Sequence, residues 1–485
     1  MHKLPLLLAF FASLAACSSS SSDQPQTSDT GSDGADEDAA TTEPPEWNRD
    51  VTPPSDDDAT KNRASCVYKA GALPAETQGK SAPDGAKIPI DVIVVMMMEN
   101  RSFDHYFQKL PATTGRTDVE VAPDTYGNPD VDGTLVKPFR DTQYCFVDTN
   151  HEWKGSHDSY DDGRMDGFIK ANEGSGRTPP HPIPGLLRGT RAMTYYEQAD
   201  LPFMYWAADQ FAIADHYHCA LLGPTWPNRM YLYGATSYGR TTNKLGDIKK
   251  GQMTIFDELE ARRIPWRVYA SATPGGAVVA GSFVKYVEEH VVPREQFVTD
   301  AAAGTLPKMV FLDPNIGAER YDQNDEHPEA IMQIGQAFIA ESVKALMGGP
   351  QWSKSALFIT YDEHGGLYDH VPPPQACAPD DIAPIDLAAD DPVAKFDRLG
   401  VRVPLVVISP YAKKRYAGHH VYDHTSITRF IEARFVLPAM SGRDANAEAP
   451  WDLFDFSAPR TDKPAVPDVP IDPAKLAACK AIFAP

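Results

Sequence analysis

The hydrophobic pattern of the chain centres on seven consecutive apolar residues, Val92–Met98, four of which are β-branched. A run of this length and composition is typical of a strand that is buried on both faces of a parallel sheet. It ends at once in polar residues, among them Glu99, Asn100 and Ser102. Ligands of open α/β proteins bind at the carboxyl ends of strands. Glu99 and Asn100 therefore stand where oxygen donors could bind a divalent cation, although Asn100 or Ser102 would also suit an ordinary helix N-cap.

The same kind of pattern predicts further strands and helices. The strands are expected at residues 266–270, 309–312, 356–361 and 403–408, and the helices at 193–212, 254–262, 328–347 and 425–435. Strands that alternate with helices predict an α/β fold with a mainly parallel central sheet and helices on both faces. Turn signals predict loops and a short hairpin over 108–140. The Pro- and Ala-rich end, 445–485, is expected to wrap the surface.

The first residues indicate a targeting signal. Lys3 precedes a short apolar stretch, Leu4 to Leu14, which is too short to span a bilayer as a mature helix. The sequence Leu14-Ala15-Ala16-Cys17 resembles the lipobox of bacterial lipoproteins, in which cleavage precedes the cysteine and lipid is attached to its sulfur. We therefore expect residues 1–17 to be a lipoprotein signal, with a plain secretory signal as the alternative. The exported protein would be anchored to the cell-envelope membrane through Cys17, or released.

Residues 18–63 have almost no large apolar side chains. Between Ser18 and Thr60, twelve acidic residues accompany one basic residue, Arg49, so this stretch carries −11 of the net charge of −22. Such a segment cannot bury enough surface to offset its ordering entropy, so we expect a disordered acidic tether. Residues 64–485 are expected to form one folded domain. The acidic charge argues against a nucleic-acid partner, because phosphate backbones need a basic surface.

Five cysteines follow Cys17 in the sequence. Disulfides are compatible with export, and an odd number leaves at least one free thiol in a monomer. Cys219 lies in an apolar stretch and is our candidate for that thiol. The pairing of the other four cannot be read from the sequence: Cys66, Cys145, Cys377 and Cys479.

The residues after the first strand resemble a known signature. Glu99-Asn100-Arg101-Ser102-Phe103-Asp104-His105-Tyr106-Phe107 is similar to a motif of the bacterial phosphatidylcholine-type phospholipase C and acid phosphatase family of phosphoesterases. The match fails at Gln108, where the family usually has glycine. In that family the Glu and Asn of this motif bind the active-site metal. The resemblance therefore implies that Glu99 and Asn100 are metal ligands.

A second segment, Gly223-Pro224-Thr225-Trp226-Pro227-Asn228-Arg229, suits phosphate chemistry. Pro227 fits a first helical turn, so the Thr225 hydroxyl would lie at a helix N-terminus, as a phosphate contact or as an ordinary N-cap. Arg229 could clamp phosphate oxygens. The family has its nucleophile at the position of Thr225, and binding to the metal would activate this hydroxyl. A threonine cannot form the aldehyde that sulfatases make from Cys or Ser in a similar pattern, which argues against sulfate esters.

The remaining ligands are expected at the end of the 356–361 strand. Asp362-Glu363-His364-Gly365-Gly366, which continues into Tyr368-Asp369-His370, is similar to a family motif whose Asp and Glu bind the metal. The resemblance thus implies one divalent cation, of open identity, held by Glu99, Asn100, Thr225, Asp362 and Glu363.

A histidine is expected to protonate the leaving alkoxide. His327, in Asn324-Asp325-Glu326-His327-Pro328, and His364 are the first candidates. His157 is the third, in a turn-rich loop that begins His151-Glu152-Trp153. Tyr422-Asp423-His424 also resembles a family motif. Single histidines are as often structural as functional, so the assignment stays open.

The resemblance covers about residues 86–440 and rests on four separated motifs. It implies that 64–485 is a phosphoesterase catalytic domain with a core like that of alkaline phosphatases and sulfatases. It also implies metal-dependent hydrolysis of phosphate esters through a phospho-threonine, with phospholipids as the first expectation. The alternatives are an acid phosphatase that acts on phosphomonoesters and a lipid-anchored binding protein without activity.

Overall fold

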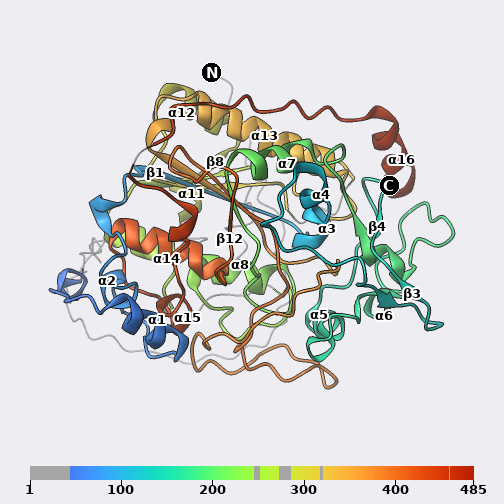
Figure 1. The fold of residues 1–485 in the computed structure, drawn as a ribbon, viewed down its shortest axis with the longest axis horizontal. Coiled ribbons are helices and arrows are strands. Elements are labelled where there is room, and N and C mark those ends of the chain that lie inside the picture. The colour runs from blue at the N-terminus through green and yellow to red at the C-terminus, as the bar shows by residue number, and fades with distance from the viewer. Residues whose placement is uncertain (1–43, 245–251, 272–285, 317–320, 458) are drawn as a thin grey trace, which may run out of the picture. The chain divides into compact units, whose positions relative to one another are not determined.

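The computed structural model describes residues 44–244, 252–271, 286–316, 321–457 and 459–485, and an eight-stranded sheet forms their centre (Figure 1). The strand order is β12-β6-β11-β10-β1-β9-β7-β8. Neighbouring strands run parallel except β11, which is antiparallel to both β10 and β6. The expected α/β fold with a mainly parallel sheet is therefore confirmed. The strands are β1 Val92–Met98, β6 Ala212–Ala214, β7 Trp266–Ala270, β8 Val291–Pro293, β9 Met309–Asp313, β10 Ser355–Tyr361, β11 Leu405–Ile408 and β12 Tyr416–Gly418.

The sheet contains all five strands predicted from the sequence. β1 has the predicted bounds, and each of its seven residues is buried. β11 is shorter than the predicted strand 403–408 and begins only after Pro404. Proline has no backbone N–H to donate to a ladder, which accounts for that start.

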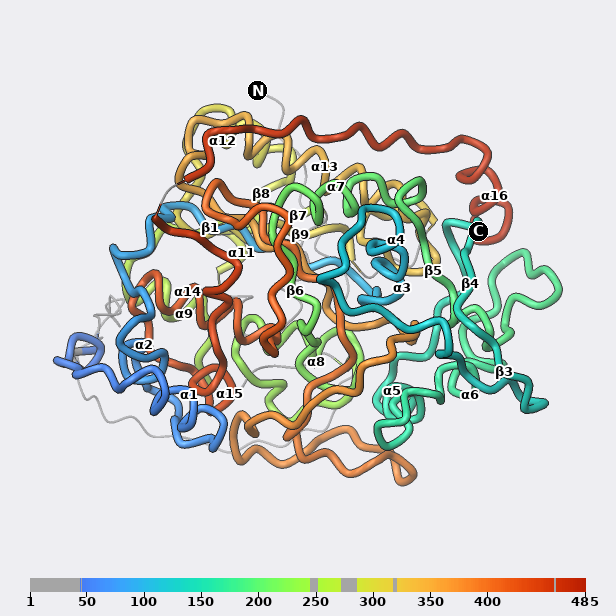
Figure 2. The backbone as a smooth tube through the Cα atoms, in the orientation of Figure 1, coloured from blue at the N-terminus to red at the C-terminus, as the bar shows by residue number. Residues whose placement is uncertain are grey.

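Helices cover both faces of the sheet (Figures 1 and 2). On one face, Phe311 of β9 packs against Phe256 of α9, and Phe358 of β10 packs against Phe430 of α14. On the other face, Tyr269 of β7 packs against Phe297 of α12. The first layer consists of α8 Thr225–Gly234, α9 Ile255–Ala261 and α14 His424–Phe435, and the second of α7 Pro202–Gln210, α12 Glu295–Ala303 and α13 Met332–Gly348.

Shorter elements surround these layers. β2 (Asn128–Pro129) and β3 (Leu135–Val136) form the expected hairpin, and β4 (Phe139–Arg140) pairs with β5 (Thr194–Tyr195). The shorter helices are α1 Asp56–Ala64, α2 Pro74–Thr77, α3 Phe103–Phe107, α4 Leu110–Thr114, α5 Trp153–Tyr160, α6 Phe168–Asn172, α11 Val287–His290, α15 Gly442–Ala445 and α16 Pro473–Phe483. None of the described helices is long and apolar enough to cross a bilayer.

The predicted helix 193–212 is wrong. Met193 ends a 3-10 helix, residues 194–195 form β5, α7 begins only at Pro202, and residues 212–214 form β6. Pro202 lies at the start of α7, where its missing N–H costs no hydrogen bond. The apolar spacing that suggested one helix therefore comes from three separate buried elements.

The predicted acidic tether also ends earlier than expected. Pro45–Asn48 form a short 3-10 helix, and α1 begins at Asp56 with the Ser55 side chain as its N-cap. The three consecutive aspartates of its first turn are favourable beside the helix N-terminus. Arg63 of α1 is buried and donates to the Thr77 carbonyl at 2.7 Å. The lipoprotein signal 1–17 and the tether up to residue 43 lie outside the described residues.

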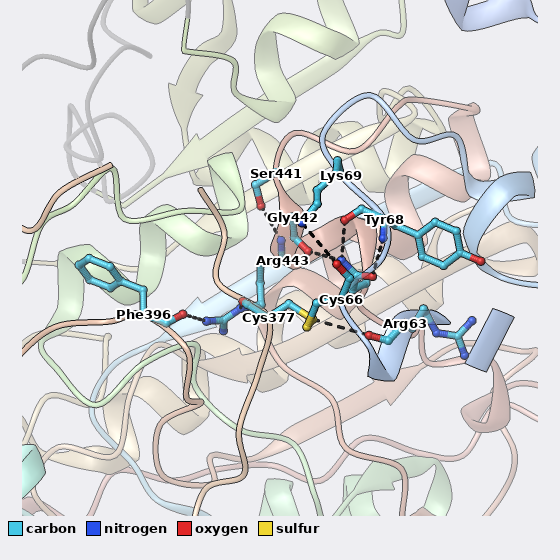
Figure 3. The surroundings of a disulfide bond; sticks show 10 residues. Arg63, Cys66, Tyr68, Lys69, Cys377, Phe396, Ser441, Gly442 and Arg443 are labelled. Atoms are coloured by element: carbon cyan, nitrogen blue, oxygen red, sulfur yellow. Dashed lines mark hydrogen bonds between the residues drawn. A yellow bond between two sulfur atoms is a disulfide. The ribbon is translucent and has the colours of Figure 1, made fainter. Parts of the chain in front are cut away.

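Two disulfides tie distant parts of the chain together. Cys66–Cys377 links the end of α1 to a long loop, and Arg443 donates to the Cys377 carbonyl at 2.6 Å beside it (Figure 3). Cys145–Cys479 fastens α16. The C-terminal segment that precedes α16 runs along α13 (Figure 1). That path agrees with the expected surface wrapping. Cys219 is free and buried, as predicted.

Candidate active site

The register of β1 and β10 brings two polar motifs together. Met98 pairs with Tyr361, so Glu99-Asn100 and Asp362-Glu363 leave neighbouring strands side by side. The Asn100 N–H donates to Asp362 Oδ1 at 3.1 Å, and the Arg101 N–H donates to the Glu363 carbonyl at 3.0 Å. Asn100 has a φ of 59°, which Asn tolerates better than most residues. All four predicted ligands from the two strand ends are therefore buried in one cluster.

Gly365 allows the two motifs to approach this closely. Its φ is +63°, and a Cβ at this position would lie 2.5 Å from the Asn100 carbonyl oxygen. Any side chain here would push the strand ends apart. The glycine of the Asp362-Glu363-His364-Gly365 motif thus has a steric role at the site.

The Asn100 side chain bridges carboxylates of the cluster. Its NH₂ donates to Glu363 Oε1 at 2.8 Å and to Glu99 Oε2 at 3.2 Å, and its oxygen accepts from His327 Nε2 at 3.3 Å. The Glu99, Asp362 and Glu363 carboxylates are all buried here. Carboxylate and amide oxygens suit a hard divalent ion.

The electrostatics of the cluster also fit a cation. Burial, followed by the charge of Asp362, raises the pKa of Glu99 well above its ordinary value. Burial raises the pKa of Glu363 to about 8, with a further contribution from Asp362. Buried carboxylates this close together are costly unless positive charge compensates them. Arg229 supplies one such charge, and a divalent ion would supply the rest.

Thr225 is the first residue of α8, as expected from Pro227 in the first turn. It is 6% exposed, and Arg229, one helical turn later, bonds Glu99 and Asp362 of the cluster. Asn228 holds the preceding loop, because its side chain accepts from the Leu221 N–H at 3.0 Å and donates to the Gly223 carbonyl at 2.8 Å. The hydroxyl of Thr225 is therefore carried by a rigid turn.

Arg229 does not act as the phosphate clamp that the sequence suggested. Its guanidinium is fully buried and donates to Glu99 Oε1 at 2.9 Å, to Asp362 Oδ2 at 3.3 Å and to the Met98 carbonyl at 2.9 Å. The donors are engaged by the ligand carboxylates and the end of β1. Arg229 instead docks the first turn of α8, and with it Thr225, against the ligand cluster.

The predicted histidines lie in different surroundings. His327 lies at the cluster, 3.7 Å from Asp148 Oδ2, and its Nδ1 has no hydrogen-bond partner among the described residues. His364 lies behind Glu363: its Nδ1 is 3.4 Å from Oε2, the oxygen that faces away from Asn100. Burial lowers the pKa of His364 to about 3. A fully buried, neutral ring in this position is not placed to protonate a leaving group.

His157 is not part of the cluster. It lies on α5, where its Nδ1 bonds the Trp153 carbonyl at 2.7 Å and its ring packs on Trp153 at 4.6 Å. It lines a separate cavity of about 380 Å³ together with Leu222, Phe396 and other residues. His157 therefore belongs to a predicted site loop but does not itself reach the proposed ligands.

The histidine of this loop that reaches the cluster is His151. Its Nε2 is 4.0 Å from Glu363 Oε1, and its Nδ1 bonds the Thr149 carbonyl at 2.7 Å. Burial alone would lower the pKa of His151, but the charges of Glu363, Asp148 and Glu152 raise it to about 10. One ligand atom each of Asp148, His151 and His327 lies within 4.8 Å of the others. The turn-rich sequence predicted a site loop. It gave no reason to prefer His151 over His157 as the histidine at the cluster.

Other motif residues support the framework. Arg402 pairs with Asp104 at 3.0 Å and with Asp369 at 2.8 Å, and all three are fully buried. Asp104 follows the first ligand pair in sequence and Asp369 follows the second. This ion-pair network therefore joins the two motifs a second time.

The chain is similar to several known proteins. The phosphoesterase family model matches residues 90–438. The chain is 31% identical over 431 residues to non-specific phospholipase C1 of Arabidopsis thaliana, which covers 82% of this chain and 77% of that protein. It is 30% identical over 445 residues to phospholipase C B of Mycobacterium tuberculosis, over 80% and 82% of the two chains. A solved structure of an alkaline phosphatase superfamily protein from Vibrio parahaemolyticus is 10% identical, covering 70% of this chain and 78% of that one, with a TM-score of 0.33.

Proposed function

Because this chain belongs to the phosphoesterase family and is a phosphoric ester hydrolase, we propose that it is a metal-dependent phospholipase C that acts through Thr225. The observation that carries the proposal is the burial of three carboxylates, Glu99, Asp362 and Glu363, in one cluster to which Arg229 ties the first turn of α8. The names of the similar proteins favour a phospholipid over a phosphomonoester. A phospholipase C cleaves the bond between phosphate and diacylglycerol.

The chain's own residues fit a bound divalent ion. Glu99, Asn100, Asp362 and Glu363 would hold it, with Thr225 as a further ligand. When bound, such an ion lowers the pKa of a coordinated hydroxyl and polarises a phosphoryl oxygen. Arg229 keeps the Glu99 and Asp362 carboxylates in place, and Gly365 keeps the strand ends close. Identity of the ion stays open, because oxygen donors of this kind serve several divalent metals.

The proposed reaction has two steps. Thr225 Oγ gives its proton to solvent and attacks phosphorus, the bond from phosphorus to the glycerol oxygen breaks, and His327 gives a proton to the departing alkoxide. Water then attacks phosphorus and passes a proton to His327, the bond from Oγ to phosphorus breaks, and Oγ takes up a proton from solvent. His327 is our choice of acid because it borders the ligands while its Nδ1 lacks a partner among the described residues. His151 would contact the phosphoryl group.

A substrate panel tests the proposal. Wild type, Thr225→Ala and Thr225→Ser are assayed on phosphatidylcholine, a phosphomonoester and a sulfate ester. We expect diacylglycerol from phosphatidylcholine with wild type, partial activity with Thr225→Ser, and a loss of several orders of magnitude with Thr225→Ala. Turnover of the monoester alone would identify an acid phosphatase. Turnover of none of the three would favour a lipid-anchored binding protein, and full activity of Thr225→Ala would exclude this nucleophile.

We also propose that the enzyme is exported and held at the cell envelope by lipid on Cys17. The support is the lipobox-like Leu14-Ala15-Ala16-Cys17 and the acidic stretch that follows. Phospholipid substrate lies in a membrane, so an anchor would keep the enzyme near it. The lipid on Cys17 and the active site would then both contact the same membrane.

A further inference from the structure

The peptide group between Asp362 and Glu363 joins two of the proposed metal ligands. It lies beyond the paired part of the sheet, because the ladder with β1 ends at Tyr361 and the ladder with β11 ends at Thr360. Asp362 is fully buried, so water does not reach its carbonyl oxygen. Buried carbonyls require a hydrogen-bond donor from the protein.

His424 supplies this donor. Its Nε2 lies 2.7 Å from the Asp362 carbonyl oxygen, and its Nδ1 lies 2.8 Å from the Tyr217 hydroxyl oxygen. A carbonyl only accepts, so Nε2 carries the hydrogen, and Nδ1 of the neutral ring accepts from the Tyr217 hydroxyl. Tyr217 thereby fixes both the tautomer and the orientation of the imidazole.

The other side of the same peptide group is bound to a ligand carboxylate. The Glu363 N–H donates to Asp362 Oδ1 at 2.8 Å. A rotation of this peptide group would therefore move the Asp362 carboxylate and the Glu363 backbone together. The hydrogen bond from His424 opposes that rotation from the carbonyl side.

His424 is itself held firmly. It is the first residue of α14, and the preceding Asp423 caps the helix by accepting from the Thr425 N–H at 2.9 Å. Asp423 also pairs with the buried Arg443 at 3.3 Å. The ring therefore starts from a fixed backbone position and is oriented by a buried hydroxyl.

We propose that His424, oriented by Tyr217, is a positioning residue that sets the peptide group between Asp362 and Glu363 and so the geometry of both carboxylates. The proposal rests on the proposed function, since it assumes that these carboxylates bind a metal. Residues that orient metal ligands typically change metal affinity or activity by about 10- to 100-fold when they are lost. His424 was noted in the sequence only as part of a motif without an assigned role.

Four variants test the proposal. His424→Gln keeps an amide donor, His424→Met removes it at similar volume, and Tyr217→Phe removes only the orienting hydroxyl. His218→Met is the matched control: His218 is also fully buried and bonds a backbone carbonyl at 2.8 Å, but that carbonyl belongs to Gly400. Mn²⁺, Zn²⁺ and Ca²⁺ affinities are measured by competition with a chelator, alongside kcat, KM and the melting temperature.

We expect His424→Met to weaken binding of the preferred ion about 10- to 100-fold and to lower kcat with little change in KM. His424→Gln should recover most of the affinity, and Tyr217→Phe should lie between the two. His218→Met should lower the melting temperature without changing the affinity. Equal affinity in wild type and folded His424→Met would overturn the proposal, as would equal losses in His424→Gln and His424→Met. If wild type binds none of the ions, the proposed metal-dependent function fails first.

Discussion

Arg229 donates to the Glu99 carboxylate at 2.9 Å with both side chains buried. The same guanidinium reaches Asp362 at 3.3 Å, so one side chain joins α8 to the ends of β1 and β10. The sequence pattern suggested Arg229 for substrate binding. In the structure it instead joins two of the proposed ligands to the helix of the proposed nucleophile. Removal of the positive charge would leave these two buried carboxylates without their ion-pair partner.

The first prediction concerns this pairing. A lysine keeps the charge but cannot bond both carboxylates in a fixed plane, so Arg229→Lys should reduce activity and metal content. Arg229→Met should lower the free energy of unfolding by about 3–5 kcal/mol in urea titrations, because breaking a buried pair leaves uncompensated charge. Arg267→Lys is the control, since its pair with Asp300 is partly exposed and contributes about 0–1 kcal/mol. Wild-type metal content and activity in Arg229→Lys would contradict the proposed positioning role.

The second prediction concerns metal removal. Dialysis of wild type against a chelator should abolish phosphate-ester hydrolysis, and a divalent ion should restore it. Asp362→Asn should bind less metal by elemental analysis, because the amide removes one negative charge from the oxygen cluster. Asp300→Asn, on α12, should retain wild-type metal content. Full activity of metal-free protein would rule out metal dependence.

The third prediction separates two histidines of one loop. His151→Gln should lower kcat by about 10²-fold or more, because His151 lies 4.0 Å from Glu363 at the cluster. His157→Gln should change kcat little, because His157 bonds the Trp153 carbonyl and lines another cavity. Steady-state kinetics of both variants on one substrate provide the comparison. The reverse order of effects would show that His157, not His151, is the functional histidine of the two.

The fourth prediction concerns pH and stability at Glu258, far from the proposed ligands in sequence. Burial, then the charge of Asp444, raises the pKa of Glu258 well above its ordinary value. The folded protein therefore binds more protons than the unfolded protein above about pH 4.5, and the free energy of unfolding falls as pH rises through this range. Glu258→Gln should make the melting temperature less dependent on pH between 5 and 8. Glu295→Gln, on the exposed side of α12, should leave the pH dependence unchanged, and an unchanged slope in Glu258→Gln would refute the assignment.

The fifth prediction concerns the N-terminus. In cells that process lipoproteins, mature protein should begin at Cys17 and carry lipid, measured as intact mass in the membrane fraction. Cys17→Ser should move the protein to the soluble exported fraction with its activity retained. A mature wild-type protein with an unmodified terminus later in the acidic stretch would contradict lipidation.

The spacing of apolar residues predicted most of the strands and helices whose bounds depend on neighbouring residues in the sequence. The bounds of β1 follow from one apolar run between polar residues, and its carboxyl end located Glu99 and Asn100. The 254–262 and 425–435 helices were found within a residue or two, because their apolar faces follow helical spacing. The 193–212 helix failed because residues buried by three different neighbours happened to follow the same spacing.

Long-range contacts could not be read from the same patterns. The sequence predicts that Arg229 lies one helical turn after Thr225. Only the folded chain shows that its guanidinium contacts Glu99 and Asp362. His151 and His157 belong to one predicted loop. In the structure His151 precedes α5 and meets Glu363, whereas His157 lies on α5. Disulfide partners more than 300 residues apart are likewise set by the tertiary structure.

The separation of the two ligand motifs has a consequence for when the site can exist. Asn100 and Asp362 are 262 positions apart, and the disulfides span 311 and 334 residues. When only the first half of the chain has been synthesised, Glu99 and Asn100 are present but β10, with Asp362 and Glu363 at its end, is not. Closing so long a loop is also slow. The oxygen cluster is therefore assembled late, after most of the chain has been delivered. On an exported protein, the ions available where folding ends, rather than where synthesis takes place, would decide which metal is captured.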